Sequence, residues 1–257
     1  MKSARVSLSR MAVWSHLGFR DLRSRYARTK LGAWWSASTL FAVVIGISLS
    51  VALLSDQPAV DLAPRVAIAM AMWTLISSTL TESAEAFVAD RGILLNLPIS
   101  EKVMTARLVW RNYLVYLHNA TVMFVFLLID TRSIWSMLRL AMVVFLLGPM
   151  VIATLFVPAL ILSRLGARFP DLRVFAGTAV QLNFFITPVL WDPPATGVMR
   201  TIFLLNPLGW YVQLAKEAVF LDQIPTELVV LVLFLFMVSA AMYLVVVRHL
   251  PSIKKYL

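Results

Sequence analysis

The chain has 257 residues, of which 60% are hydrophobic and 14% charged, and it carries a net charge of +10 and no cysteine. Soluble domains average about 25% charged residues, so this composition and the mean hydropathy of +0.83 predict an all-α polytopic membrane protein. The lack of cysteine excludes a disulfide framework and a thiolate metal site.

The first 33 residues are strongly basic and precede the first long apolar run. If they form a helix, Trp14, Leu22 and Tyr26 share one face, which is typical of an amphipathic helix lying on an anionic membrane surface. A solvated basic tail is the alternative. The apolar run at 34–54 is about 31 Å long as a helix, enough to cross a bilayer. It does not end in the small-residue cleavage site of a signal peptide, so we expect a retained span.

Six membrane spans are expected in all, at about 34–54, 65–85, 103–129, 138–162, 174–190 and 227–247. Pro149 and Pro158 predict bends in the fourth span, with the freed carbonyls satisfied by neighbouring helices. A carboxylate within a span, such as Glu82, is a functional candidate, but pairing with a nearby arginine is the favoured interpretation. Between Gly92 and Pro98 we expect a short helix on the membrane surface.

Positive charges are distributed unevenly between the two sides of these spans. The N-terminal segment, the region 90–111, the loop 164–173 and the tail hold 18 of the 23 Lys and Arg residues, and the other side holds 5. Cytoplasmic loops are enriched in Lys and Arg, so both termini and the two short surface segments are expected in the cytoplasm.

The stretch 181–223 consists of apolar pieces that prolines separate, and each piece is too short to span a membrane. It predicts a re-entrant element beside a pathway on the outer side, although a single irregular span followed by a surface loop is also compatible. Aromatic side chains are concentrated there. They fit stacking on sugar rings and a membrane-interface belt equally well.

The sequence contains no catalytic motif that we could identify. The HExxH, GxSxG and P-loop patterns are absent, and His16, His118 and His249 lie on different predicted elements. We therefore expect no catalytic site, no metal and no cofactor in this chain.

Four segments resemble the signatures of ABC-2 type permeases that export polysaccharides, and they occur in the family's order. They are RDLRSRYARTKLGAWW at 20–35, RFPDLR at 168–173, TPVLW at 187–191 and NPLGWYVQLAKEA at 206–218. Relatives of this kind export O-antigen, teichoic acid, capsule and mycobacterial galactan.

The resemblance implies a homodimer in the bacterial inner membrane, in which each copy binds a separate cytoplasmic ATPase that holds ATP and Mg²⁺. The cargo would be a polysaccharide on a polyprenyl diphosphate lipid. The segments at about 86–100 and 166–173 resemble coupling helices that dock on the ATPase. They contain the coupling candidates Asp90, Arg91, Leu94, Leu95, Arg168 and Asp171.

The region at about 191–223 resembles the family's pair of re-entrant helices at the outer gate, here about 193–205 and 207–222. The candidates for the substrate channel or gate are Phe184, Phe185, Trp191, Asn206, Pro207, Trp210 and Tyr211. Arginine binds phosphate bidentately, so the basic N-terminal segment also offers contacts for the lipid diphosphate. The candidates are Arg23, Arg25, Arg28 and Lys30, for which simple attraction to anionic lipid is an equal alternative.

Other functions fit parts of the sequence. An ABC-2 exporter of a drug or small lipid would differ from a polysaccharide exporter by having a closed, tight interface in place of a wide pore lined by aromatic residues. A membrane-embedded glycosyltransferase or phosphotransferase would need clustered acids, and the expected cytoplasmic acids form no DxD pattern. A scaffold without transport is the fourth possibility.

Overall fold

The chain folds into helices, whose bounds in chain order are α1 (Lys2–Arg25), α2 (Trp34–Leu54), α3 (Ala59–Ala89), α4 (Arg91–Asn96), α5 (Glu101–Ile129), α6 (Ile134–Met142), the π-helical η1 (Val143–Leu147), α7 (Gly148–Arg168), α8 (Asp171–Ile186), α9 (Val198–Leu205), α10 (Pro207–Phe220) and α11 (Thr226–His249). The computed structural model describes residues 2–27, 29–54, 58–130, 133–221 and 224–249. No strand occurs among them, which confirms the all-α class.

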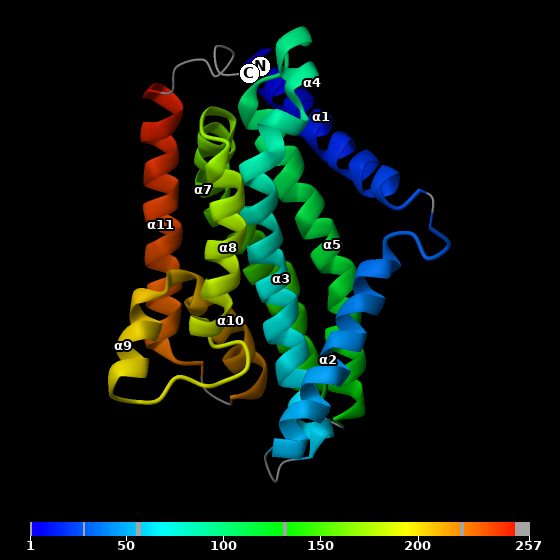
Figure 1. Cartoon of the computed structure of the whole chain (residues 1–257), viewed down its shortest axis with the longest axis vertical. Helices are drawn as coiled ribbons and strands as arrows, with labels where there is room; N and C mark the ends of the chain where they lie inside the picture. Colours follow the sequence, from blue (N-terminus) through cyan, green and yellow to red (C-terminus); the bar gives the residue numbers. More distant parts are fainter. Residues whose placement is uncertain (1, 28, 55–57, 131–132, 222–223, 250–257) are drawn as a thin grey trace.

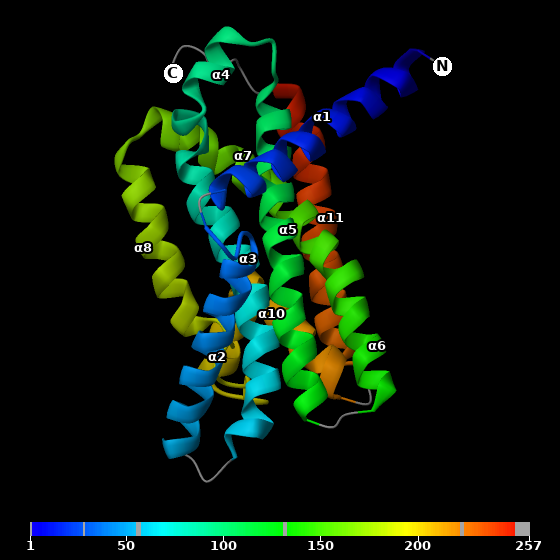
Figure 2. The same cartoon turned by 90° about the vertical axis from the view of Figure 1, so that its right-hand side faces the viewer.

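The long helices run side by side along the molecule, and the short ones lie at its two ends (Figure 1; Figure 2). One end carries α4 and is crossed by α1, and we call it the α4 end. The opposite end carries α9 and α10, and we call it the α10 end. The short helix expected between Gly92 and Pro98 is confirmed as α4.

Helix α3 is the centre of the bundle and contacts α2, α5, α7, α8 and α10. Its buried positions are rich in alanine and serine, and such small residues let neighbouring helices come close. The closest approach is at Gly166 of α7, where a Cβ atom would lie 1.9 Å from the backbone oxygen of Ala84. Helix α7 therefore packs directly on the backbone of α3.

In the part of the chain that the structure describes, five helical stretches are long and apolar enough to cross a membrane: α2, α3, α5, the continuous run Ile134–Arg168, and α11 up to Val246. Four of the six predicted spans fall within them, and a fifth, at 227–247, extends one residue beyond Val246. In its most apolar window, α3 buries 61% of its residues, whereas α2 and α11 bury only 22% and 11%. The apolar faces of α2 and α11 therefore cover the outside of the bundle, as expected of helices that contact lipid.

The predicted span at 174–190 differs most from the observed helix. It corresponds to α8, whose 16 residues measure about 24 Å and which is not among those five stretches. The helix ends at Ile186 rather than at Leu190. The reason is Pro188, because a proline disfavours helical geometry at the residue before it. The length and composition of the described helices therefore support five membrane crossings and do not show that α8 is a sixth.

Both prolines in the run Ile134–Arg168 free a backbone carbonyl that a neighbouring side chain then binds. Pro149 follows the π-helical turn η1, and the carbonyl of Val144, five residues before it, accepts a hydrogen bond of 3.2 Å from the hydroxyl of Tyr113. Pro158 lies inside α7, and the carbonyl of Thr154 accepts one of 2.7 Å from Ser239. The expected satisfaction by neighbours is confirmed at both sites, although α7 continues through Pro158 without a break in its assignment.

Candidate functional site

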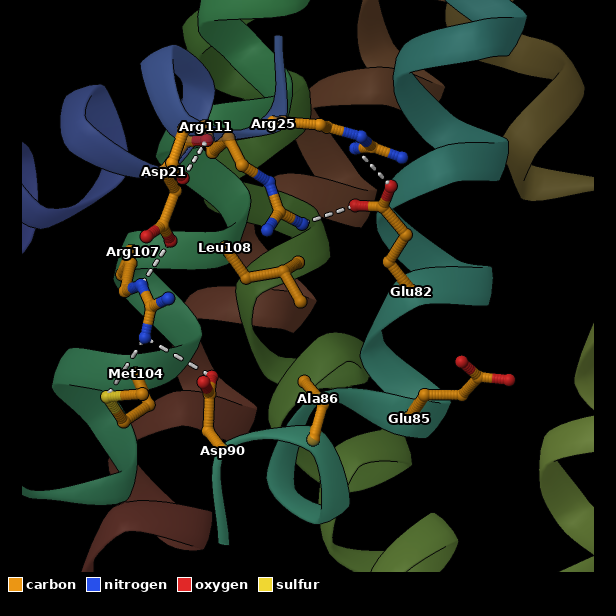
Figure 3. A pocket seen from close by; sticks show the side chains of 12 residues that line it. Asp21, Arg25, Glu82, Glu85, Ala86, Asp90, Met104, Arg107, Leu108 and Arg111 are labelled. Carbon is orange, nitrogen blue, oxygen red and sulfur yellow. Dashed lines mark hydrogen bonds and ion pairs between the residues drawn. The ribbon is translucent and has the colours of Figure 1, made fainter. Parts of the chain in front are cut away.

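The α4 end is built around charged side chains that join α1 to α3 and α5 (Figure 3). Arg107 of α5 lies between two carboxylates. Its Nε donates to Asp21 of α1, and its Nη1 lies 3.3 Å from Oδ2 of Asp90, at the end of α3. All three side chains are at most about one quarter exposed. Burial raises the pKa of Asp90 above its ordinary value, against the opposing attraction of Arg107.

A second chain of ion pairs lies one to two turns away along the same helices. Glu82 of α3 accepts a hydrogen bond of 2.7 Å from Arg25 of α1 through one oxygen, and it accepts another from Arg111 of α5 through the other. The pairing of Glu82 with a nearby arginine, predicted from the sequence, is confirmed. The two arginines bind different oxygens of the carboxylate, so Glu82 ties α1 to α5 through α3.

A cavity of about 450 Å³ lies between the two chains of ion pairs. Its charged lining consists of four carboxylates and three guanidinium groups, which leaves one net negative charge. The carboxylate of Glu85 points away from the arginines in Figure 3. Among the described residues, no group of three or more His, Cys, Asp and Glu side chains is arranged to hold a metal ion.

The apolar face of α1 packs on α5. Trp14 meets Trp110 edge to face with 5.6 Å between ring centroids, and Leu22 is only 4% exposed. A Cβ atom on Gly18 would lie 2.9 Å from the Trp110 ring and 3.0 Å from the carbonyl of Arg107. The face expected to lie on lipid is therefore covered by protein, because glycine at this position lets the two helices touch.

The candidates for phosphate binding separate into different environments. Arg23 and Lys30 are exposed, whereas Arg25 is engaged by Glu82. Arg28 lies outside the described residues. Neutralising Arg25 would therefore loosen α1 as well as remove a positive charge, so Arg23 and Lys30 are the cleaner positions for testing contact with a phosphate.

The coupling candidates occupy two places at the α4 end. Arg91 and Leu95 are exposed on α4, while Leu94 is 2% exposed and anchors that helix against the bundle. The other pair lies where α7 ends and α8 begins, with Arg168 as the last residue of α7 and Asp171 as the first of α8. The segment 166–173 is thus a tight connection rather than a helix of its own.

At the α10 end, α10 begins at Pro207, where the second re-entrant helix was expected to begin, and Asn206 precedes it. The Asn206 side chain caps the helix by accepting from the backbone N–H of Gly209. The expected helix at 193–205 begins only at Val198, because Pro193, Pro194 and Gly197 precede it.

The aromatic gate candidates are mostly turned inward. Tyr211 is 1% exposed and its hydroxyl lies 2.6 Å from Thr154 Oγ1, while the indole N–H of Trp210 donates to the carbonyl of Phe203. Phe184 packs on Trp73 of α3. Phe185 is the exception, because 69% of it is exposed on α8. Trp191 is half-buried in the segment after α8.

Two functional groupings were not found by sequence reasoning. One is the central place of Arg107, whose partners lie 86 and 17 residues away in the chain. The other is Lys216, which is 4% exposed and binds the segment before α9. The position of Lys216 within NPLGWYVQLAKEA offers one signal, because a lysine in a mostly apolar helix needs a partner. Neither a family model nor a curated protein matches this chain.

Proposed function

We propose that the chain is the membrane-spanning permease subunit of an ABC exporter that moves a lipid-linked polysaccharide across the bacterial inner membrane. Two copies pair in this proposal, and ATP hydrolysis takes place on a separate cytoplasmic subunit. Helix α8 is the sixth crossing, both termini are cytoplasmic, and α9 and α10 form the re-entrant pair at the outer side. The four signature-like segments, which occur in the family's order, support this assignment.

The observation that carries the proposal is the polar surface of α8. Gln181 and Thr178 are exposed on this helix, and a Cβ atom on Gly177 would meet nothing within 4 Å. Phe185 lies one turn after Gln181 on the same face. Helix α8 runs along the bundle beside α3 (Figure 2), so this surface is not confined to an end of the molecule.

Polar side chains on a membrane helix generally face another protein or a water-filled cavity, because contact with hydrocarbon is costly. A face that combines an amide, a hydroxyl and an aromatic ring is suited to a hydroxyl-rich cargo. A second copy of the chain opposite this face would complete a polar path for such a cargo.

The α4 end supports the part of the proposal that concerns a soluble partner. Helix α4 protrudes from the bundle at this end (Figure 2). Its buried Leu94 fixes it to the bundle, while Leu95 and Leu97 are 38% and 48% exposed. An apolar surface on a well-anchored short helix is typical of a docking site for another protein.

Purification of the full chain from its native membranes in mild detergent tests the proposal. We expect a soluble protein with a P-loop to co-purify and the complex to hydrolyse ATP. Depletion of the chain should cause polyprenyl-diphosphate-linked glycan to accumulate inside the cell. The absence of an ATPase partner together with unchanged lipid-linked glycan would refute the proposal, and altered sensitivity to small molecules with unchanged glycan would favour a drug or small-lipid exporter.

Substitution on α8 tests the observation itself. Gln181→Leu removes the amide from the exposed face and should abolish export while leaving insertion and ATPase binding intact. Leu182→Ala is the matched control, because Leu182 is also exposed, at 63%, but carries no polar group. Equal export by the two variants would mean that Gln181 does not line the path.

A further inference from the structure

The segment between α8 and α9 begins by lying along α10. We call residues 187–192 the strap. At its start, Asn206 Nδ2 donates to Thr187 Oγ1 at 2.9 Å. Next, Pro188 packs against Gly209, where an added Cβ atom would lie 3.0 Å from the proline ring. The strap is thus held to the first turn of α10 by a hydrogen bond and by a close contact that needs glycine.

Lys216 holds the other end of the strap, about two turns further along α10. Its ammonium group donates to the carbonyl of Trp191 at 2.9 Å and to Oδ1 of Asp192 at 2.8 Å. Residues 206, 209, 213 and 216 recur at the spacing of one helix face, so the strap follows a single stripe of α10. Trp191 is therefore positioned through its backbone by a lysine that the sequence places 25 residues later.

The two members of this ion pair differ sharply in exposure. The side chain of Lys216 is 5% exposed, whereas that of Asp192 is 61% exposed. Asp192 can exchange its partner for water at little cost, but Lys216 cannot, because an unpaired ammonium group in a buried site is strongly unfavourable. The closed position of the strap is therefore stabilised mainly because it pairs the buried ammonium group of Lys216.

The surroundings of Asp192 favour its charged form. Arg65 of α3 lies 3.8 Å from Oδ2, and Gln213 Nε2 lies 3.5 Å from Oδ1. Burial opposes ionisation, but the hydrogen bond and charge of Lys216, helped by Gln213 and Arg65, hold the pKa of Asp192 below its ordinary value. Glu217 is the other acid here, and it accepts a hydrogen bond from Gln213.

The closed strap also leaves polar atoms without a hydrogen bond among the described residues. They are the indole nitrogen of Trp191, Oε1 of Gln213 and Oε2 of Glu217. Each buried group of this kind costs free energy that contact with water recovers. Closure by Lys216 and Asp192 is thus opposed by buried polar groups that contact with water would satisfy.

We propose that Lys216 and Asp192 form a latch that holds the strap on α10, and that the strap swings away from α10 when the two side chains separate. Opening frees Trp191 and the adjoining end of α8 from α10. The latch rests on the contacts of the strap alone, and it stands whether or not the chain is an exporter.

A cysteine reporter tests the latch, because the chain has no cysteine of its own. Val189 lies in the strap and is 3% exposed, whereas the adjacent Leu190 is 45% exposed. Val189→Cys in the purified full chain should react slowly with a maleimide while the strap is closed. Leu190→Cys should react fast in every background and controls for the reagent.

The reporter is then combined with changes to the latch. Asp192→Asn leaves Lys216 buried without a carboxylate and should accelerate labelling of Val189→Cys by about tenfold or more. Lys216→Met removes both hydrogen bonds that hold this end of the strap, so it should also accelerate labelling by about tenfold. The double variant should label no faster than the faster single variant, because the two changes break the same pair. Glu227→Gln, which breaks the ion pair with Arg200 at the same end, should change nothing.

A folded Asp192→Asn or Lys216→Met variant that labels at the parent rate would overturn the latch. Independent effects of the two changes, with the double variant faster than either single variant by the product of their accelerations, would also overturn it. If Asp192→Asn cannot be purified, Asn206→Ala replaces it, because it releases the Thr187 end of the strap without burying a charge. Faster labelling in that variant supports the hinged strap, and an unchanged rate contradicts it.

Discussion

Gly166 of α7 offers the sharpest test of how the bundle is packed. A Cβ atom there would lie 1.9 Å from the carbonyl oxygen of Ala84 and 2.8 Å from its carbonyl carbon. Ordinary contacts of this kind are longer by more than an ångström, and the obstacle is the backbone of the central helix rather than a flexible side chain. Gly166→Ala must therefore push α7 away from α3.

Two effects of this substitution have opposite signs. Alanine is favoured over glycine in a helix interior by about 1 kcal/mol, so without the contact the variant would be more stable. Overpacking a buried site costs about 1–3 kcal/mol, and more where backbone must move. The neighbouring Leu160 and Ser163 are 1% exposed, so separation of the helices opens a well-packed region. We expect a net loss of about 2 kcal/mol.

Thermal unfolding of the detergent-purified chain, followed by size-exclusion chromatography after heating, measures the effect. In a chain of this size about 1 kcal/mol corresponds to roughly 2–4 °C, so Gly166→Ala should lower the midpoint by about 4–8 °C. Gly46→Ala in α2 and Gly177→Ala in α8 are matched controls, because an added Cβ atom meets nothing within 4 Å at either position. These controls should raise the midpoint slightly. A rise for Gly166→Ala as well would refute the close approach of α7 to α3.

Three further predictions concern other contacts. Glu82→Gln removes the negative charge that Arg25 and Arg111 both bind, so the docking of α1 on the bundle should weaken by about 1.5–3 kcal/mol. Trypsin should then cut α1 faster in membranes, and an unchanged cutting rate would count against the ion pairs. Tyr113→Phe removes the hydrogen bond to the carbonyl in η1 and should cost about 1 kcal/mol in thermal unfolding, whereas no loss would mean that this bond adds nothing. The lowered pKa of Asp192 means that the latch persists at and above the ordinary aspartate value and is lost as the pH falls through the lower folded value. Because only the thiolate reacts, the rate of Val189→Cys is divided by that of Leu190→Cys at the same pH; this ratio should stay flat down to about pH 4 and rise below it, and a rise near pH 6 would implicate another group.

Much of the fold follows from local sequence signals. Long apolar runs correspond to α2, α3, α5, α11 and the stretch Ile134–Arg168, because an apolar helix of that length is specified by composition alone. Helix α4 was predicted because Gly92 and Pro98 bracket its apolar residues. The expected end of α8 at Leu190 lies four residues beyond the observed one, because the apolar run continues past Pro188 whereas this proline disfavours helical geometry at the residue before it.

Less of the candidate site can be predicted from the sequence, because the residues that contact one another there lie far apart in the chain. The sequence identified Glu82 as needing an arginine, but nothing local selects Arg25, 57 residues away, or Arg111. The same holds for Gly18 and Gly166, whose importance lies in what an added Cβ atom would meet on another helix. The sequence predicts Tyr211 and Trp210 as gate residues, because an aromatic residue type does not distinguish a ring in the core from one at a surface.

The two ends of the molecule share one element, and this places α3 at the centre of any conformational change. At the α4 end, α3 supplies Glu82 and leads into Asp90, which bind α1 and α5. At the α10 end, Arg65 near the start of α3 lies 3.8 Å from Asp192 of the latch. A helix that is packed on α2, α5, α7, α8 and α10, with α7 in contact with its backbone, is expected to move as a rigid piece, because a close-packed interior transmits displacement. Movement of α1 or α4 that pulls on Glu82 or Asp90 would therefore act on Arg65, and through it on the exposed carboxylate that the latch can most easily release.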